Sequence, residues 1–339
     1  MVDPIDIRPK KKFLQFSKNE FNKSLVLETL EKNILAHWST WGKFQQIWNN
    51  QAFNTFKDFD KYILLIYLIR DYFQQLSNKF EYLTYEEFYE CEFFTIDKLN
   101  LIKIASDLNI PKETIRRKVN ELQKDGTLRR DGKSIILQKE LLSYQKPEKS
   151  LDAISKFLHK KSILLQGEKW FGNKIEENEI KMYIKKYYTI IWLRFLKLQI
   201  PFLTRHRKNF LDLETWVIWG NVALHHQKNL DILINNSLEN IKIDYSNYYQ
   251  KVVGVSINRG VNASSIADVS GIPRATVIRK LRWLVTQQAI KRNKKLEYVL
   301  QYKGNLNKKS EENFKINQGT VAEFLADFFD YYKNSNFRP

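Results

Sequence analysis

The hydrophobic positions of residues 99–124 follow a helical period that is interrupted once. The apolar side chains fall on one face of each of two successive helices: Ile104, Leu108, Ile115, Val119 and Leu122. Asn109 lies between the two stripes, and asparagine tolerates a left-handed backbone. Pro111 follows at the start of the second helix, where its missing N–H costs nothing. The pattern predicts a helix-turn-helix over 99–124 whose second helix turns a polar face outward.

The pattern changes from helical to alternating after this segment. The stretch "LRRDGKSIIL" at 128–137 alternates around Asp131 and Gly132, and Asp-Gly is a dipeptide typical of a tight turn between two strands. We therefore expect a β-hairpin over 128–137. A hairpin that follows a helix-turn-helix in this way is the wing of a winged helix.

The same succession occurs a second time. At one constant offset, Ile104, Pro111 and Arg117 match Ile266, Pro273 and Arg279, and Gly271 takes the place of Asn109. This pairing predicts a second helix-turn-helix over 262–287 and a second wing over 290–300. Upstream the offset is slightly smaller, and three further identical pairs follow it: Trp38/Trp192, Lys43/Lys197 and Gln45/Gln199. The sequence therefore indicates an internal duplication.

Each copy places apolar helices before its motif, so we expect a mainly α fold in which the wings supply the only β-structure. At 339 residues the chain is long enough for two domains that each bury a core. The expected parts are a basic arm (1–18), a first helical module (19–142), a linker with a short helix (143–172), a second helical module (173–304), and a polar spacer with a C-terminal amphipathic helix (305–339).

The last helix is expected to begin at Thr320, which forms a capping-box pattern with Glu323. Its apolar stripe has helical spacing: Val321, Phe324, Leu325, Phe328 and Tyr332. We expect this stripe to pack on its own chain. The alternative is a homodimer contact.

Composition narrows the class of partner. The formal net charge is +18 and the pI is near 9.6, which favours a polyanionic partner, although a bias toward Lys, Asn and Ile accounts for part of the charge. The longest apolar runs, such as residues 62–69, are far shorter than the about 20 residues of a membrane helix. With the single Cys91 and no stretch of signal-peptide length, these features predict a cytoplasmic protein without a membrane segment.

No pattern of catalytic or metal-binding residues occurs. The five histidines show no zinc-site spacing with Cys or carboxylates: His37, His159, His206, His225 and His226. Glycine-rich phosphate loops and paired catalytic carboxylates are also missing from the sequence, so we expect neither an enzyme nor a cofactor. Tryptophans concentrate in the helices before each motif, which favours a buried core over a small-molecule pocket.

The second helix of each motif carries the features of a DNA reader. "KETIRR" and "RATVIR" resemble the Arg-Glu-Thr-Val-x-Arg core of the recognition helix in the Crp/Fnr family of bacterial transcription regulators, and "DGKSIIL" resembles that family's wing. The resemblance implies a set of base-reading positions: Lys112, Glu113, Arg117, Arg274 and Arg279. Ala275 departs from the acidic position of the family, and no segment resembles its cyclic-nucleotide domain, so cyclic-nucleotide sensing is not implied.

The two copies differ on the outward face of the second helix. Where the first copy has Arg116, Glu121 and Gln123, the second has Ile278, Trp283 and Val285. Arg116 is therefore a further base-contact candidate, and Ile278 either contacts a thymine methyl group or belongs to a protein interface. The remaining polar and basic positions are expected to contact phosphate: Thr114, Lys118, Arg129, Arg130, Lys133, Thr276, Lys280, Lys291, Arg292, Lys294 and Lys295.

These observations together favour sequence-specific binding of double-stranded DNA, with the function of a transcription regulator. Two readers in one chain behave as a covalent dimer, since linkage raises the effective concentration of the second contact. The alternatives are a winged-helix scaffold for protein assembly, which the apolar face of the second copy favours, and RNA binding.

Overall fold

A computed structural model of the chain describes residues 22–97, 100–138, 148–236, 244–254, 259–301, 303–335 and 337. The predicted basic arm lies outside these residues. The described part is mainly α-helical and holds two small antiparallel sheets, as expected. None of the described helices combines the length and apolar character needed to cross a membrane.

In the described part of the chain, the first half contains the elements that lead up to the first predicted motif, the elements of that motif, and one helix that follows it. In order, they are α1 (Lys23–Lys32), α2 (Ile34–Phe56), α3 (Phe59–Asn78), α4 (Tyr85–Glu90), β1 (Phe93–Ile96), α5 (Leu101–Leu108), α6 (Lys112–Lys124), β2 (Leu128–Asp131), β3 (Ser134–Gln138) and α8 (Glu148–Gln166).

The second half repeats much of this order. Its elements are α9 (Glu177–Lys186), α10 (Tyr188–Asn209), α11 (Leu213–Asn236), α12 (Tyr248–Gly254), α13 (Ala263–Ser270), α14 (Arg274–Thr286), β4 (Ile290–Arg292), β5 (Tyr298–Leu300) and α15 (Gly304–Asn334). Both ends of α9 follow those of α1 at the offset of the upstream residue pairs. Both ends of α13 and of α14 follow those of α5 and α6 at the offset of the motif.

The turns between the paired helices form as the sequence predicts. The helices before the turns begin at asparagine caps, because the side chain of Asn100 accepts from Lys103 N (3.0 Å) and that of Asn262 from Ser265 N (2.8 Å). They end at Asn109 and Gly271, whose φ angles of 52° and 71° are left-handed. The same backbone signals therefore set both helix pairs.

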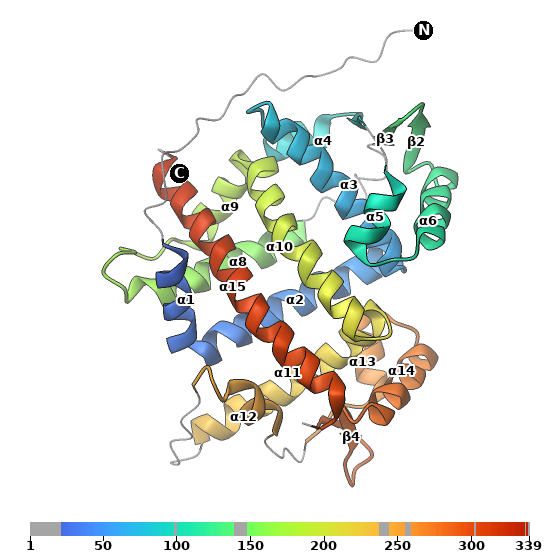
Figure 1. Cartoon of the computed structure of the whole chain (residues 1–339). Coiled ribbons are helices and arrows are strands. Elements are labelled where there is room, and N and C mark those ends of the chain that lie inside the picture. Colours follow the sequence, from blue (N-terminus) through green and yellow to red (C-terminus); the bar gives the residue numbers. More distant parts are fainter. Residues whose placement is uncertain are drawn as a thin grey trace.

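A single hydrophobic core runs through both halves of the described chain. Helix α10 packs on α3 and α15, and α2 packs on α8 and α11, so the long helices of one half are covered by helices of the other. Figure 1 shows α2, α8, α10 and α15 together in the middle of the molecule. The expectation that each module buries its own core is wrong, because the apolar faces of the modules meet each other.

The β-structure extends beyond the two hairpins. Strands β2 and β3 pair with Asp131 opposite Ser134, and β4 pairs with β5, as predicted. Strand β1 adds to the free edge of β3, with Phe94 opposite Leu137. The wings are therefore not the only β-structure, since a strand that precedes the motif completes the first sheet.

The expected linker is largely a core helix. Helix α8 spans 19 residues, and its apolar side chains Leu151, Ile154 and Leu158 are buried against α2 and α9. The mixture of lysines and apolar residues that suggests a linker with a short helix is the pattern of a half-buried helix.

The C-terminal helix begins at Gly304, well before its predicted start. Thr320 lies inside α15, and its hydroxyl donates to Asn317 O (3.1 Å) instead of capping a terminus. The predicted stripe packs on the chain itself, where α15 packs on α1 and α10. Val321 and Phe328 are fully covered, and Tyr332 is half-buried against the core. This packing leaves the alternative homodimer without the apolar surface proposed for it.

Candidate nucleic-acid interface

Helix α6 presents one buried and one exposed face. Ile115, Val119 and Leu122 are buried and fix the helix against the core. The base-contact candidates of this helix all lie on its exposed face: Lys112, Glu113, Arg116 and Arg117. Glu113 is paired with Arg116 (2.8 Å). The exposed face therefore carries Lys112 and two arginines, each of which is paired with a glutamate of the same helix, Arg116 with Glu113 and Arg117 with Glu121 (3.7 Å).

Helix α14 has the same buried face and a less charged exposed face. Arg274 and Arg279 are exposed, and Arg274 Nε donates to the Ser264 hydroxyl (3.0 Å) on α13. Ile278 is half-buried in a shallow hollow between α14 and the hairpin, next to the exposed Leu296 at the hairpin tip. The second copy thus combines outward arginines with a hollow that is lined both by apolar residues and by arginines.

Trp283 does not belong to this outward surface. It is half-buried and packs against the core, whereas its neighbour Val285 is exposed. Of the three apolar residues that distinguish the second copy, Trp283 therefore has a structural role, and Ile278 and Val285 remain accessible.

Lys118 and Lys280, predicted to contact phosphate, are buried at equivalent places in the two copies. Lys118 Nζ donates to Asp58 Oδ2 (2.6 Å) and to Glu121 Oε2 (3.0 Å). Lys280 Nζ donates to Asp212 and lies 3.4 Å from Glu214 Oε2. The prediction that these two lysines contact phosphate is wrong. Each lysine points toward a long helix that lies before the motif, so its ion pair links α6 to the start of α3, and α14 to the start of α11.

The two aspartates of these pairs, Asp58 and Asp212, are held in the charged state. Burial raises the pKa of Asp58, but the hydrogen bonds from Lys118 and from backbone N–H groups outweigh that effect and lower the pKa. The pKa of Asp212 is lowered in the same way by Lys280 and by the backbone and hydroxyl of Thr215. The two aspartates are separated by the offset of the upstream repeat. That coincidence of acid and base in both copies is the sequence signal for these pairs.

The hairpins place basic side chains beside the exposed helix faces. All of the predicted phosphate-contact residues of the hairpins are exposed: Arg129, Arg130, Lys133, Lys291, Arg292, Lys294 and Lys295. Arg292 donates to Leu296 O (3.3 Å) across the second hairpin, which orders its guanidinium. Thr114 and Thr276 are half-buried near the start of each helix. Among the candidates in the hairpins, none is withdrawn from solvent.

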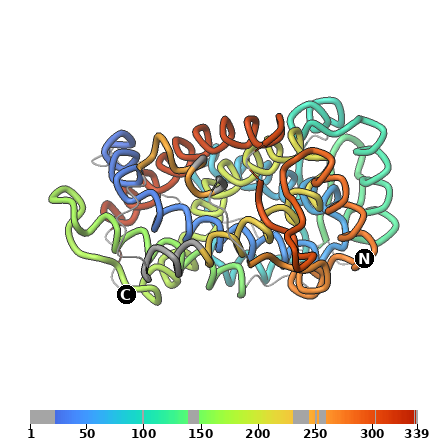
Figure 2. Tube along the Cα trace, turned by 90° about the horizontal axis from the view of Figure 1, so that it is seen from below, coloured from blue at the N-terminus to red at the C-terminus, as the bar shows by residue number. Residues whose placement is uncertain are grey.

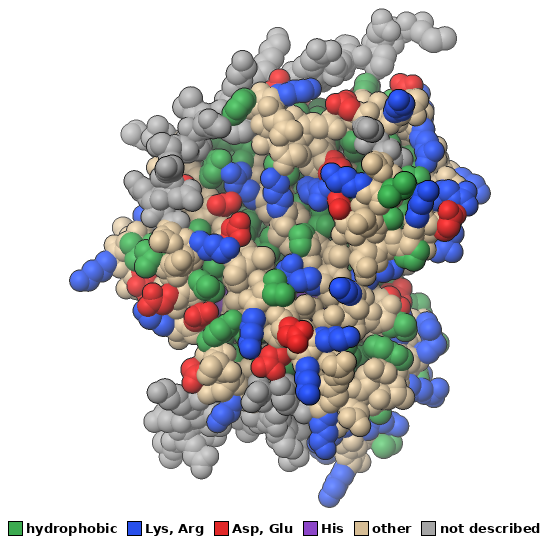
Figure 3. All heavy atoms as spheres, viewed as in Figure 1, with side chains coloured by type: hydrophobic (Ala, Val, Ile, Leu, Met, Phe, Trp, Pro, Cys, Tyr) green, Lys and Arg blue, Asp and Glu red, His purple; other side chains and the backbone are tan. Residues whose placement is uncertain are grey.

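The two exposed helices lie at the same edge of the molecule. Figure 1 places α6 above α14 at one side, and Figure 2, which looks from below, shows both segments again at one end. The space-filling view in Figure 3 shows Lys and Arg side chains gathered along this edge, over α6 and over α14 with its hairpin. The arrangement places two basic surfaces at one edge of the described part of the molecule.

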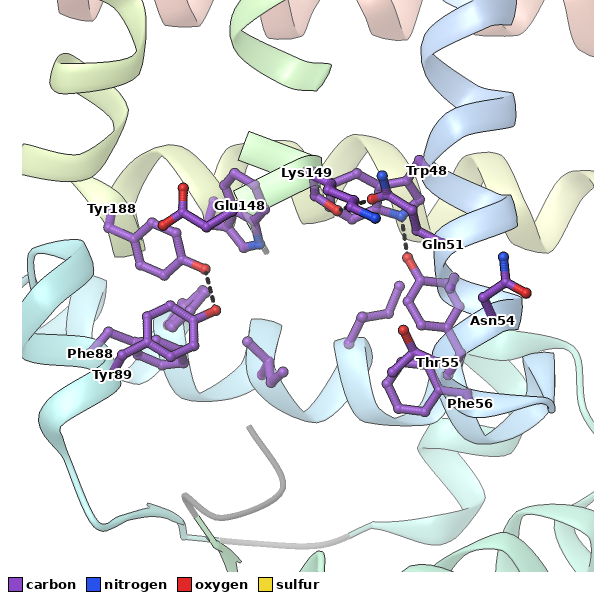
Figure 4. Close-up of a pocket in the computed structure, with 17 residues that line it drawn as sticks. Trp48, Gln51, Asn54, Thr55, Phe56, Phe88, Tyr89, Glu148, Lys149 and Tyr188 are labelled. Atoms are coloured by element: carbon purple, nitrogen blue, oxygen red, sulfur yellow. Dashed lines mark hydrogen bonds between the residues drawn. The ribbon is translucent and has the colours of Figure 1, made fainter. Parts of the chain in front are cut away.

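Aromatic residues at repeated positions line two pockets, and residues of both halves contribute to each pocket. The larger has a volume of about 460 Å³ and is lined by Trp48, Tyr62, Tyr188 and Trp192 among others (Figure 4). Tyr89 and Tyr188 share a hydrogen bond (3.1 Å) in its wall. The smaller, of about 100 Å³, is lined by residues that include Phe202 and Trp216, the equivalents of Trp48 and Tyr62. Most tryptophans nevertheless belong to the core, as the sequence predicts.

The described residues contain no cluster of three or more histidine, cysteine or acidic side chains that could hold a metal ion. Cys91 is buried, and its thiol donates to Glu87 O (3.2 Å). Comparisons with known proteins find no matching family model, no similar curated protein and no similar solved structure.

Proposed function

We propose that the chain binds double-stranded DNA through α6 and α14, each acting as the recognition helix of a winged helix-turn-helix. The observation that carries the proposal is the position of these two helices at one edge, each with outward arginines and a basic hairpin beside it. A helix of this kind fits the major groove, and cationic hairpin tips contact phosphate.

The proposal includes a duplicated origin for the two readers and a role in regulating transcription. The repeated helix ends, the paired asparagine caps and the two equivalent Lys–Asp pairs support the duplication. Bases are read by the candidates on the exposed faces, with Lys112, Arg116 and Arg117 in the first copy and Arg274 and Arg279 in the second. Lys118 and Lys280 are excluded from the set of phosphate contacts because they are buried.

Binding to a random-sequence duplex tests the electrostatic part. If about six phosphates are contacted, the logarithm of the affinity should fall with the logarithm of salt concentration with a slope of about −5, because bound counterions are released. A flat titration, or no binding at low salt, would remove the proposal.

Two single substitutions distinguish the recognition of bases from sequence-independent contact with phosphate. Arg117→Ala should cost about 1–3 kcal/mol on a preferred site and blur preference at one base pair, because a bidentate base contact is lost. Lys294→Ala, at the second hairpin, should weaken all sequences alike. Equal and sequence-blind losses in both variants would contradict the assignment of α6 as a reader.

The accessible apolar residues in the hollow of the second copy support a second candidate function, the binding of a protein partner by α14. Ile278, Val285 and Leu296 are accessible apolar side chains around that hollow. Ile278→Arg distinguishes the two uses. If Ile278 contacts a thymine methyl group, base preference changes in one half of the site. If it holds a protein, the DNA footprint is unchanged and a protein complex is lost in light scattering.

A further inference from the structure

Equivalent residues of the two copies meet each other in the core. Gln45 and Gln199, which are paired in the upstream repeat, exchange two hydrogen bonds: Gln45 Nε2 donates to Gln199 Oε1 (2.7 Å), and Gln199 Nε2 donates to Gln45 Oε1 (2.9 Å). Both side chains are buried. A residue that contacts its own equivalent in this reciprocal way lies on an axis that exchanges the two copies.

The aromatic contacts around this pair are reciprocal as well. Trp41 stacks edge-on against Phe202 (5.3 Å between ring centroids), and Trp48 stacks edge-on against Phe195 (4.8 Å). At the offset of the upstream repeat, Phe195 is the equivalent of Trp41, and Phe202 is the equivalent of Trp48. Each contact is therefore the image of the other under exchange of the copies.

The same exchange holds for whole helices. Helix α3 packs on α10 while its counterpart α11 packs on α2, and α8 packs on α2 and α9 while α15 packs on α10 and α1. The motif helices follow, since α13 packs on α2 and α5 packs on α10. Translation along an axis would place the second copy beside the first without these exchanged contacts. Only a rotation of half a turn produces them.

We infer that the DNA site of this protein is an imperfect inverted repeat. The inference rests on the proposed DNA binding. Readers related by a half-turn approach the duplex in opposite directions, so the two halves of the site run in opposite directions along the DNA, with their centres one helical turn, about 10 base pairs, or a multiple of it apart. Readers related by translation would require a direct repeat.

The distance between the half-sites is fixed by the core. Arg207 of the second copy donates to Asn109 O (2.8 Å), in the turn between α5 and α6. It also forms an ion pair with Asp60 of the first copy (3.3 Å). In the other direction, Asn54 of the first copy lies against Gly271, where a Cβ atom would come within 1.9 Å of Asn54 Oδ1. Each turn is thus held by the long helix of the other copy. The readers cannot separate as they would on a flexible linker, and only one spacing is expected to bind well.

The two halves of the repeat differ in sequence because the two readers differ. At equivalent positions the first copy has Lys112, Glu113 and Arg116, and the second has Arg274, Ala275 and Ile278. Arginine and lysine read guanine, and a branched apolar side chain contacts the thymine methyl group. At the position where Arg116 prefers guanine in the first half-site, the second half-site should therefore prefer thymine.

The experiment uses the full chain and a random duplex pool, followed by synthetic duplexes built from the enriched half-sites. At fixed salt, an inverted pair at the selected spacing should bind about 100-fold tighter than a single half-site, because the second contact is intramolecular. The direct pair at the same spacing, and the inverted pair with about 5 base pairs inserted, should bind no better than a single half-site, because the second reader then faces the wrong side or direction of the groove.

Two matched variants assign the halves. Arg117→Ala should blur one half of the enriched motif and Arg279→Ala the other. Equal or tighter binding to the direct repeat would overturn the inference while leaving DNA binding intact, and so would an enriched motif with a single half that is insensitive to Arg279→Ala. Absence of binding to every duplex at low salt would instead remove the proposed function.

Discussion

The helical period predicts which positions of α6 and α14 are exposed, but by itself it does not predict that Lys118 and Lys280 turn inward. Lys118 follows Ile115 by three positions and precedes Val119, so it lies at the border of the buried stripe. Its side chain could turn outward to phosphate or inward to an acid. The acid that decides this, Asp58, lies 60 residues away in sequence. A helical period reports the direction of a side chain and not its distant partner.

The buried pair of Lys280 with Asp212 predicts that Lys280 contributes to stability and makes no contact with DNA. Lys280→Ala should lower the free energy of unfolding by about 3 kcal/mol, because it leaves the charge of Asp212 without its partner in a half-buried place. Urea unfolding measures this change. Lys294→Ala is the control, since this lysine is exposed and its loss should leave stability within about 0.5 kcal/mol. A Lys280→Ala variant that is fully stable but binds DNA less tightly would return Lys280 to the phosphate contacts.

At the scale of elements, the helix pairs and hairpins were predictable because their signals are local. Caps, left-handed turn residues and an Asp-Gly turn each act within a few residues. The start of α15 was not predictable in this way. The residues before Thr320 are polar, but Asn307 and Asn317 are buried in the structure. Asn307 Nδ2 donates to Gln301 O (2.7 Å), and Asn317 accepts from Arg205 (2.7 Å). The polar composition of this segment therefore predicts a spacer, although the segment is a half-buried helix whose buried asparagines form hydrogen bonds with residues outside it.

Helix α8 contains a buried lysine at a place where its counterpart α15 has an apolar residue. Phe157 packs on Trp41 as Phe324 packs on Phe195, and one turn later α8 has Lys161 where α15 has Phe328. Lys161 is fully buried, and its ammonium group donates to His37 O (2.8 Å). Burial, with a smaller contribution from Lys160, holds the pKa of Lys161 well below its ordinary value.

Lys161→Met should stabilise the protein at neutral pH. The unfolded chain binds a proton on this lysine up to a pH near 10, whereas the folded chain releases it at lower pH, so stability rises with pH between the two pKa values. The variant should show a higher melting temperature at pH 7 and a smaller rise toward pH 10. The Lys161 side chain also donates to the Thr40 hydroxyl. In the variant neither His37 O nor the Thr40 hydroxyl loses its last hydrogen-bond partner, because the Thr40 hydroxyl lies within hydrogen-bond distance of His37 O (2.8 Å) and of Ala36 O (3.0 Å). A lower melting temperature at both pH values would contradict this account.

At the scale of the whole molecule, the sequence predicts a repeat but not the exchange of helices between its two halves. The apolar faces of α2 and α10 would be buried equally well if each half folded on itself or if each half covered the other. The hydrophobic pattern is the same in both cases. What decides between them is long-range packing, such as the reciprocal contact of Gln45 with Gln199, which no local period encodes.

The exchanged core predicts that neither half folds alone. The fragment 1–142, which ends at the predicted module boundary, would expose Trp41, Phe44 and Trp48, since their partners Phe195 and Phe202 belong to the second half. Fragments 1–142 and 143–339, expressed separately, should lack a cooperative thermal transition. Mixed after unfolding, they should associate and regain one transition. The full chain should unfold in a single step, with circular dichroism and tryptophan fluorescence giving coincident curves. Cooperative unfolding of fragment 1–142 by itself would show that the halves are independent domains and would contradict a fixed spacing between the two proposed readers.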